Sequence, residues 1–236
     1  MTMFARAPLA LVPALILASA TGAMARDTTR VSVDWPGYYH GPLRCAGCDR
    51  AEAWIRLSGT HGATRVEIVE NRRSARPIVV RLAGEGHWLA DGSTIELTTT
   101  DATRRLFVSE GYVELAEEPG APAPRSARPV LRKASVYAGG GQQLFVTGGG
   151  GAAGKAVFEG VINFERPPEG GHRSLQARFE IDCRARTYTT PRIGYFSDEF
   201  ATGKLIHGRP RNDDPPRPLA GGDDVVAQAA TDFCAR

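Results

Sequence analysis

The feature that most constrains the fold is a run of short, evenly spaced segments in the first half of the chain. Val66 and Ile68 alternate with charged neighbours, and Ile95 and Leu97 alternate with polar ones. Alternation at every second position places one side of a strand on a core and the other in solvent. Turn residues separate the segments, which cover 51–59, 64–70, 76–84, 93–100, 105–109 and 112–117. This spacing predicts a small antiparallel β-barrel, which leaves no open sheet edge.

The second half contains one clear strand and one clear helix. Over residues 174–185, one face carries Leu175, Ala177, Phe179, Ile181 and Cys183, and polar side chains alternate with them. The C-terminal segment predicts a helix with Asp223 or Asp224 at its N-cap and a stripe of Val225 or Val226, Ala229 and Phe233. Cys234 lies beside that stripe, so a Cys183–Cys234 disulfide would join the helix to the apolar face of the sheet. Two free, buried thiols are the alternative.

A proline-rich stretch divides the two halves. Residues 118–131 contain four prolines and no periodicity, which predicts an extended linker. We therefore expect a β-barrel domain over 26–117 and an α+β domain over 132–236. The fold class is mainly β.

The first 25 residues have the layout of a secretory signal peptide. Residues 1–25 carry one charge, Arg6, then an apolar run and the small-residue pattern Ala23-Met24-Ala25, which predicts cleavage before Arg26. No later segment approaches the roughly 18 apolar residues of a membrane span. We expect a soluble protein of the periplasm, with secretion as the alternative.

The charge balance argues against a nucleic-acid partner. Removal of Arg6 with the signal leaves 28 basic and 26 acidic residues, and no block of five like charges occurs. Nucleic-acid binding needs clustered basic charge. An oxidising compartment also favours disulfides for the four cysteines, and one Cys pair in each half is the simplest of three pairings.

Cys45 and Cys48 form a Cys-x-x-Cys motif. A permanent disulfide loop, a redox-sensing disulfide and a copper or zinc site are the competing interpretations. His40 lies five residues upstream, within reach on one loop, and adds a third donor for a metal. A haem attachment site would need His after Cys48, where Asp49 stands instead. A thioredoxin-type site is disfavoured because a strand, and no helix, is expected to follow.

The first half resembles the copper-resistance lipoprotein NlpE family. The residues that carry this resemblance, across most of 36–117, are Tyr39, Gly41, Cys45, Ala46, Cys48, Trp88, Asp91, Gly92, Ile95 and Leu97. Arg44 and Gly47 depart from the family pattern, and the lipid-anchoring cysteine is missing. The resemblance implies a small lipocalin-like antiparallel β-barrel connected with copper or envelope-stress responses.

The second half is similar to the surface-adhesin protein E-like family. The matching positions, within residues 132–236, are Ser174, Ile181, Asp182, Cys183, Tyr195, Gly203, Lys204 and Cys234. This resemblance implies an antiparallel sheet with a C-terminal helix bonded across it by Cys183 and Cys234.

Together these observations predict a non-catalytic envelope protein that requires no cofactor. The leading hypothesis is a binding or sensing module in which Cys45, Cys48 and His40 respond to copper, zinc or thiol redox state. The alternative is an adhesion or protein-interaction module in which both disulfides are structural. The partner is then a metal ion or another envelope protein.

Overall fold

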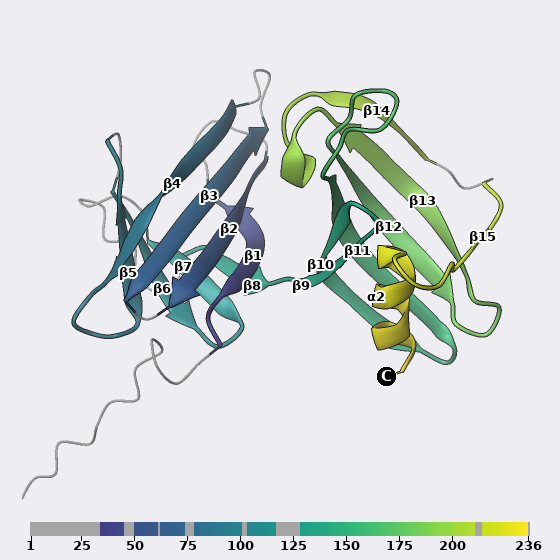
Figure 1. Ribbon diagram of the computed structural model, residues 1–236, viewed down its shortest axis with the longest axis horizontal. Coiled ribbons are helices and arrows are strands. Elements are labelled where there is room, and N and C mark those ends of the chain that lie inside the picture. The colour runs from purple at the N-terminus through teal and green to yellow at the C-terminus, as the bar shows by residue number, and fades with distance from the viewer. Residues whose placement is uncertain are drawn as a thin grey trace, which may run out of the picture.

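Two antiparallel β-structures lie side by side in the computed structural model of this protein (Figure 1). The structure describes residues 34–44, 50–60, 62–73, 78–100, 103–116, 128–210 and 214–235, so the expected signal peptide lies outside it. The first β-structure is a closed barrel and the second is an open sheet with one helix. This confirms the expected mainly β fold. In the part of the chain that is described, no helix is long and apolar enough to cross a membrane.

Eight strands close the barrel in chain order. They are β1 (Gly37–Leu43), β2 (Arg50–Thr60), β3 (Ala63–Arg73), β4 (Ile78–Trp88), β5 (Thr94–Thr98), β6 (Thr103–Ser109), β7 (Tyr112–Ala116) and β8 (Val130–Lys133). Closure comes from β1, which pairs with both β2 and β8. The alternating residues Val66, Ile68, Ile95 and Leu97 all lie in the barrel core, as predicted. The alternation of apolar and polar residues therefore reflects the packing of every second side chain into the interior of a closed sheet.

Residues of the NlpE-like pattern build the barrel. Tyr39 is fully buried, and its hydroxyl donates a hydrogen bond of 2.6 Å to the carbonyl of Trp35. Trp88 packs edge-on against Trp35, with ring centroids 5.5 Å apart. The Asp91 carboxylate accepts bonds from the backbone of Ser93 and Thr94 and so orders the turn before β5. The residues at these positions therefore have structural roles in the barrel.

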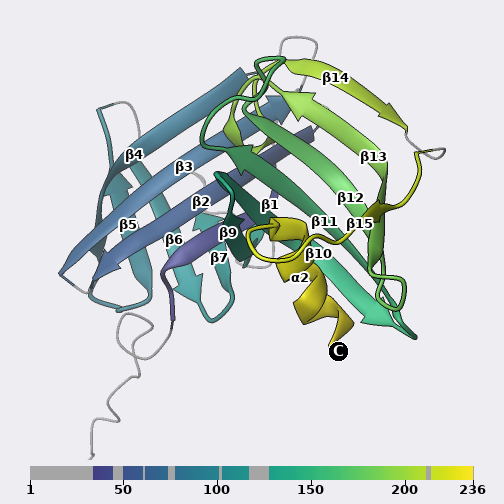
Figure 2. The same ribbon diagram turned by 45° about the vertical axis from the view of Figure 1, so that its right-hand side comes forward.

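The second β-structure is a sheet with helix α2 against one face (Figure 2). Along the sheet the order is β14-β13-β12-β11-β10-β9, with β15 paired to β13. The elements are β9 (Ser135–Gly139), β10 (Gln142–Ala152), β11 (Lys155–Phe164), β12 (Ser174–Asp182), β13 (Thr187–Phe196), the 3₁₀ turn η2 (Glu199–Ala201), β14 (Leu205–Pro210), β15 (Arg217–Pro218) and α2 (Val225–Cys234).

Helix α2 covers the apolar face that the sequence predicts for β12. Its N-cap is Asp224, whose carboxylate accepts bonds from the backbone N–H groups of Val226 and Ala227. The predicted stripe is buried against Phe158, Phe179 and Ile181 of the sheet. Gly151 allows the close approach, because a Cβ there would lie 2.5 Å from the carbonyl oxygen of Phe233.

The disulfide between Cys183 and Cys234 is present, as predicted. It joins the residue after β12 to the last residue of α2 across a sequence separation of 51 residues, with a Cα–Cα distance of 5.7 Å. The helix is thus held to the sheet covalently as well as by its apolar stripe.

The boundary between the domains differs from the expected linker. Residues 118–131 were expected to be extended and the second domain to begin at 132, but β8 (Val130–Lys133) is a barrel strand that pairs with β1 and β7. Only Ala134 lies between β8 and β9. Ala134 is buried, and its N–H donates a bond of 2.8 Å to the carbonyl of Tyr38. A single buried residue therefore joins barrel and sheet, which restricts their relative orientation.

Replacing both Cys183 and Cys234 with serine is expected to lower the free energy of unfolding by roughly 4 kcal/mol, because the bond closes a loop of about 50 residues in the unfolded chain. Urea unfolding of the oxidised proteins measures this difference. Wild type under reducing conditions should match the double variant, and a double variant as stable as oxidised wild type would contradict the prediction.

A candidate binding site between the two domains

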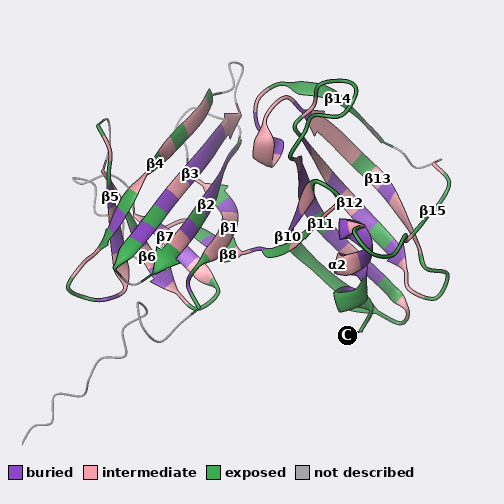
Figure 3. Cartoon of the chain, viewed as in Figure 1, coloured by how far each residue is buried: buried purple, intermediate pink, exposed green. Residues whose placement is uncertain are grey.

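A third cluster of buried residues belongs to neither domain alone. This interdomain cluster consists of Trp54, Val69, Ala134, Phe145, Val161, Phe196 and Ala201, with Tyr38, Val79 and Phe200 packed against it. Barrel strands supply Trp54 and Val69, and the sheet supplies Phe145 and Val161. Figure 3 shows buried residues on the strands of both domains that carry this cluster.

Four aromatic rings form the centre of the interdomain cluster. Trp54 lies with its ring centroid 5.5 Å from Phe145 and 5.1 Å from Phe200, and Phe145 lies 5.2 Å from Phe200. Tyr38 adds a fourth ring, 4.7 Å from Phe145. These separations are in the range that aromatic pairs prefer, where each pair contributes about 0.5–1.5 kcal/mol beyond its burial. The rings therefore hold the two domains together.

Phe200 reaches this cluster from a strained turn. It lies in η2 with φ 58° and ψ 34°, and the next residue, Ala201, also has a positive φ of 54°. Residues other than glycine rarely adopt this left-handed backbone conformation, and each residue that does so costs about 1–3 kcal/mol. Asn163 and Ser174 hold the turn: Asn163 Oδ1 accepts the Phe200 N–H at 2.8 Å, and Ser174 Oγ accepts the Ala201 N–H at 3.0 Å.

Polar contacts tie the same turn to the barrel. Asn71 Nδ2 donates to the carbonyl of Ala201 at 3.3 Å, and Arg81 donates to Thr202 Oγ1 at 3.3 Å. The Arg73 guanidinium also lies 5.8 Å from the centre of the Phe196 ring. The turn is thus fixed from both sides of the interface.

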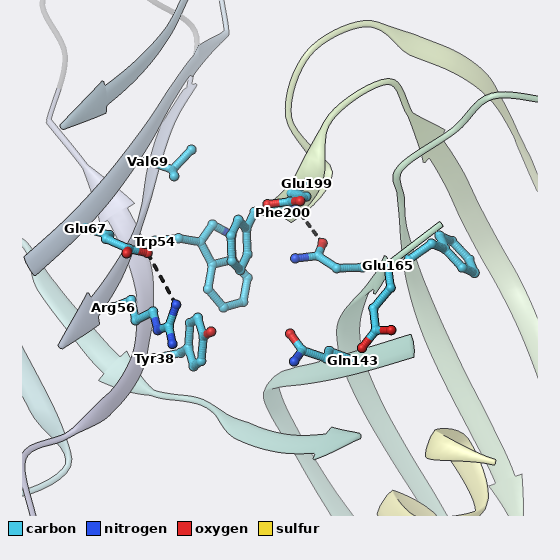
Figure 4. A pocket seen from close by; sticks show the side chains of 11 residues that line it. Tyr38, Trp54, Arg56, Glu67, Val69, Gln143, Glu165, Glu199 and Phe200 are labelled. Carbon is cyan, nitrogen blue, oxygen red and sulfur yellow. Dashed lines mark hydrogen bonds and ion pairs between the residues drawn. The ribbon is translucent and has the colours of Figure 1, made fainter. Parts of the chain in front are cut away.

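A cavity of about 270 Å³ opens beside the rings (Figure 4). It is slightly smaller than the roughly 300–1,000 Å³ typical of small-molecule pockets. Its lining comes from both domains: Tyr38, Trp54, Arg56, Glu67, Val69, Gln143, Asn163, Phe164, Glu165, Glu199 and Phe200. We call it the interdomain cavity. Trp54 is almost completely buried, whereas Tyr38 and Phe200 remain partly exposed to it.

Charged side chains surround the aromatic surface of the interdomain cavity. The Arg56 guanidinium lies 5.5 Å from the centre of the Tyr38 ring, with a nitrogen 3.6 Å from Glu67. Glu199 pairs with Arg173 at 2.9 Å. Burial raises the pKa of the Tyr38 hydroxyl; Arg56 opposes this rise, and Glu67 and Glu199 add to it. The hydroxyl is therefore neutral at physiological pH.

A second cavity, of about 860 Å³, lies over the face of the sheet opposite α2. Polar and charged side chains dominate its lining, and one of them, Arg50, comes from the barrel. Arg178 pairs with Glu180 at 3.0 Å, and Arg50 pairs with Glu52. In the lining that the structure describes, this cavity therefore lacks the aromatic surface of the interdomain cavity and presents paired charges at Arg50 and Arg178.

The sequence-predicted metal or redox residues are only partly described. Cys45 and Cys48 lie outside the described residues, between the end of β1 and the start of β2. His40 lies within β1 and not on a loop, and its ring stacks on Trp54 with centroids 4.4 Å apart. Its Nε2 lies 3.5 Å from the Glu52 carboxylate. His40 therefore already has two partners in this structure.

Glu52 and His40 form a largely buried pair beside the interdomain cluster. Burial tends to raise the pKa of the Glu52 carboxyl, but the bond from His40 and the charges of Arg50 and Arg73 outweigh it and hold that pKa below its usual value. Over the residues with described positions, no group of three or more His, Cys, Asp or Glu is arranged to hold a metal.

The interdomain cavity was not predicted from the sequence, although the sequence contains a signal for it. Trp54 lies between inward-facing Ala53 and Ile55, and Phe145 lies between Leu144 and Val146. Each is an apolar residue on the face of its strand that alternation assigns to solvent. A short continuous apolar run is typical of a strand covered on both faces, so these runs could have marked the interface.

Comparison with known proteins supports one of the two resemblances. The model of the family Surface-adhesin protein E matches residues 150–233, which lie in the second domain. The NlpE-like resemblance of the barrel stays a prediction. Among solved structures, the chain is similar to a crystal structure of a lipoprotein from Shewanella oneidensis, with 25% identity over 45% of this chain and 95% of that chain and a TM-score of 0.38. No curated protein matches the chain.

Residues of the matched family region form the strained turn. Ser174 and Gly203 both belong to the pattern identified in the sequence, and Ser174 accepts the N–H of Ala201. Gly203 has a φ of +73°, and a Cβ there would meet Asp198 Oδ2 at 2.6 Å. The turn that places Phe200 in the interface thus lies within the residues that the Surface-adhesin protein E model matches.

Asn163→Ala is expected to loosen the η2 turn, because it removes the acceptor of the Phe200 N–H. An unsatisfied buried donor costs about 1–3 kcal/mol. Amide hydrogen exchange, measured residue by residue, should show faster exchange at Phe200. Gln143→Ala, at a position that lines the same cavity without holding the turn, serves as the control; equal exchange at Phe200 in both variants would contradict this assignment.

Proposed function

We propose that this chain is an exported, non-catalytic binding protein, and that the interdomain cavity receives the group that it binds. The observation that carries the proposal is the aromatic surface built jointly by two domains, with Phe200 placed on it by a strained turn. Backbone strain concentrates at ligand sites, where the surrounding structure maintains it. Ligand pockets also occur preferentially at domain interfaces.

The chemistry of the cavity lining supports binding over catalysis. Among the described residues that line it, aromatic rings, amides and carboxylates occur, whereas serine, cysteine, histidine and lysine do not. Asn163 is committed to the turn through its side-chain oxygen. This lining offers contact area and hydrogen-bonding groups, and its described residues do not include a serine or cysteine beside a histidine.

The cellular setting is part of the same proposal. The signal-like sequence of residues 1–25 and the match to a surface-adhesin family support an exported protein, with the periplasm as its compartment. The Cys183–Cys234 disulfide suits an oxidising compartment. The surface-adhesin match also supports the view that the bound group belongs to another envelope or surface molecule.

A copper, zinc or redox role for Cys45 and Cys48 stays a second hypothesis. Arg50, two residues after Cys48, lines the larger cavity between sheet and barrel, so a response of the Cys-x-x-Cys segment could be transmitted to the domain interface. Because Nε2 of His40 faces Glu52, a metal would bind this ring at Nδ1 or displace Glu52. The hypothesis therefore rests mainly on the two cysteines.

The binding proposal predicts where small molecules attach. In a protein-observed NMR screen with fragments of varied chemistry, the hits for wild type should shift the Trp54 indole and Phe200 amide signals. Phe200→Ala should lose these hits, because it removes one ring of the cavity. Ile206→Ala, which removes an exposed apolar side chain on β14, should keep them. Hits that map elsewhere, or persist unchanged in Phe200→Ala, would refute the proposal.

A further inference from the structure

The charges lining the interdomain cavity are unequal. Three carboxylates, Glu67, Glu165 and Glu199, line it together with one cation, Arg56. Arg65 and Arg173 pair with Glu67 and Glu199, but both are largely exposed and lie outside the lining. Glu67 and Glu199 are thus paired, and among the described residues Glu165 is the lining carboxylate whose negative charge is left uncompensated.

Glu165 is the carboxylate most available to a ligand. It follows β11 directly and is exposed. Over the described parts of the chain, no basic side chain forms an ion pair with it, in contrast to Glu67 and Glu199. Figure 4 shows Glu165 on the sheet side of the cavity, opposite Arg56 and Tyr38 on the barrel side.

Arg56 shows how a cation fits this surface. Its guanidinium lies over the Tyr38 ring and beside the Glu67 carboxylate. An aromatic face with a nearby carboxylate is the combination that recognises organic cations, since the ring quadrupole and the negative charge act in the same direction. Phe200 is a partly exposed ring of the same lining, and the described cation–ring contacts of this chain do not involve it.

We propose that the interdomain cavity binds an organic ammonium group, with Tyr38 and Phe200 contacting its alkyl groups and Glu165 balancing its charge. This inference rests on the proposed function and names its ligand class. The cavity of about 270 Å³ suits a small head group and not a large ligand. The ammonium group has two sources, a free small molecule or a lysine side chain of a protein partner.

Choline is the probe for a free small molecule. Its neutral control is 3,3-dimethylbutan-1-ol, which has the same shape without the charge. Isothermal titration of the full mature chain should show choline binding more tightly than the neutral alcohol, with an affinity that falls as salt is added. A capped lysine peptide tests the second source, with the same peptide carrying norleucine as its neutral control. The source is identified by the probe pair in which the cationic compound binds more tightly than its neutral control.

Two substitutions should shift the affinity in opposite directions. Glu165→Gln should weaken binding of the cationic probe about two- to fivefold, the range of a single exposed charge pair. Arg56→Gln should strengthen it by a similar factor, because it removes a competing cation. Glu110→Gln, in the exposed turn between β6 and β7, makes the same charge change outside the cavity and should have no effect.

The outcomes separate this inference from the proposed function. If neutral or anionic fragments bind the cavity and both cationic probes bind no better than their neutral controls, the ammonium assignment is wrong and the binding function stands. If no fragment of any charge binds there, both are wrong. Equal effects of Glu165→Gln and Glu110→Gln would also overturn the ammonium assignment.

Discussion

The contact of Trp54 with Phe145 and Phe200 is the interaction on which the arrangement of this molecule depends. Barrel and sheet each have a complete apolar core of their own, so neither needs the other to bury its strands. What remains is a set of large apolar side chains on outward faces, which would be exposed if the domains separated. Their mutual burial, together with the single-residue connection at Ala134, fixes one domain against the other.

The interface between the two domains contains strained backbone. A purely structural contact would be served by relaxed side chains, yet Phe200 and Ala201 lie in left-handed backbone held by Asn163 and Ser174. The strain turns a ring towards the barrel and leaves a cavity beside it, lined by both domains. A ligand in that cavity would contact both domains at once, so binding and domain arrangement are coupled.

Much of the fold could be predicted from the sequence because one physical rule governs it. Alternation located the barrel strands and the apolar face of β12, and the positions of Cys183 and Cys234 on facing apolar surfaces indicated the disulfide. Strand β1 was not predicted from the sequence, because its two glycines and Pro42 are typical of turns. In the barrel, Gly41 is needed because a Cβ would lie 2.6 Å from the carbonyl of Val130, and Pro42 lies beyond the residues that pair with β8.

The candidate site could not be predicted in the same way. The Cys-x-x-Cys motif drew attention by its chemistry, whereas the interdomain cavity consists of common residues from β1, β2, β3, β10, β11 and η2 that only the tertiary fold brings together. His40 illustrates the difference: its position near Cys45 in sequence suggested a ligand, but the strand turns its ring onto Trp54 and Glu52. Broken alternation at Trp54 and Phe145 marks an interface, but not which partner covers it.

A double-mutant cycle between Trp54 and Phe200 tests the central claim most directly. The two rings lie 5.1 Å apart and belong to different domains. Unfolding free energies of wild type, Trp54→Ala, Phe200→Ala and the double variant should give a coupling of about 0.5–1.5 kcal/mol. The same cycle with Trp88, whose ring packs on Trp35 at the barrel core, should be additive within about 0.5 kcal/mol. An additive Trp54–Phe200 cycle would show that the aromatic contact between the domains does not form.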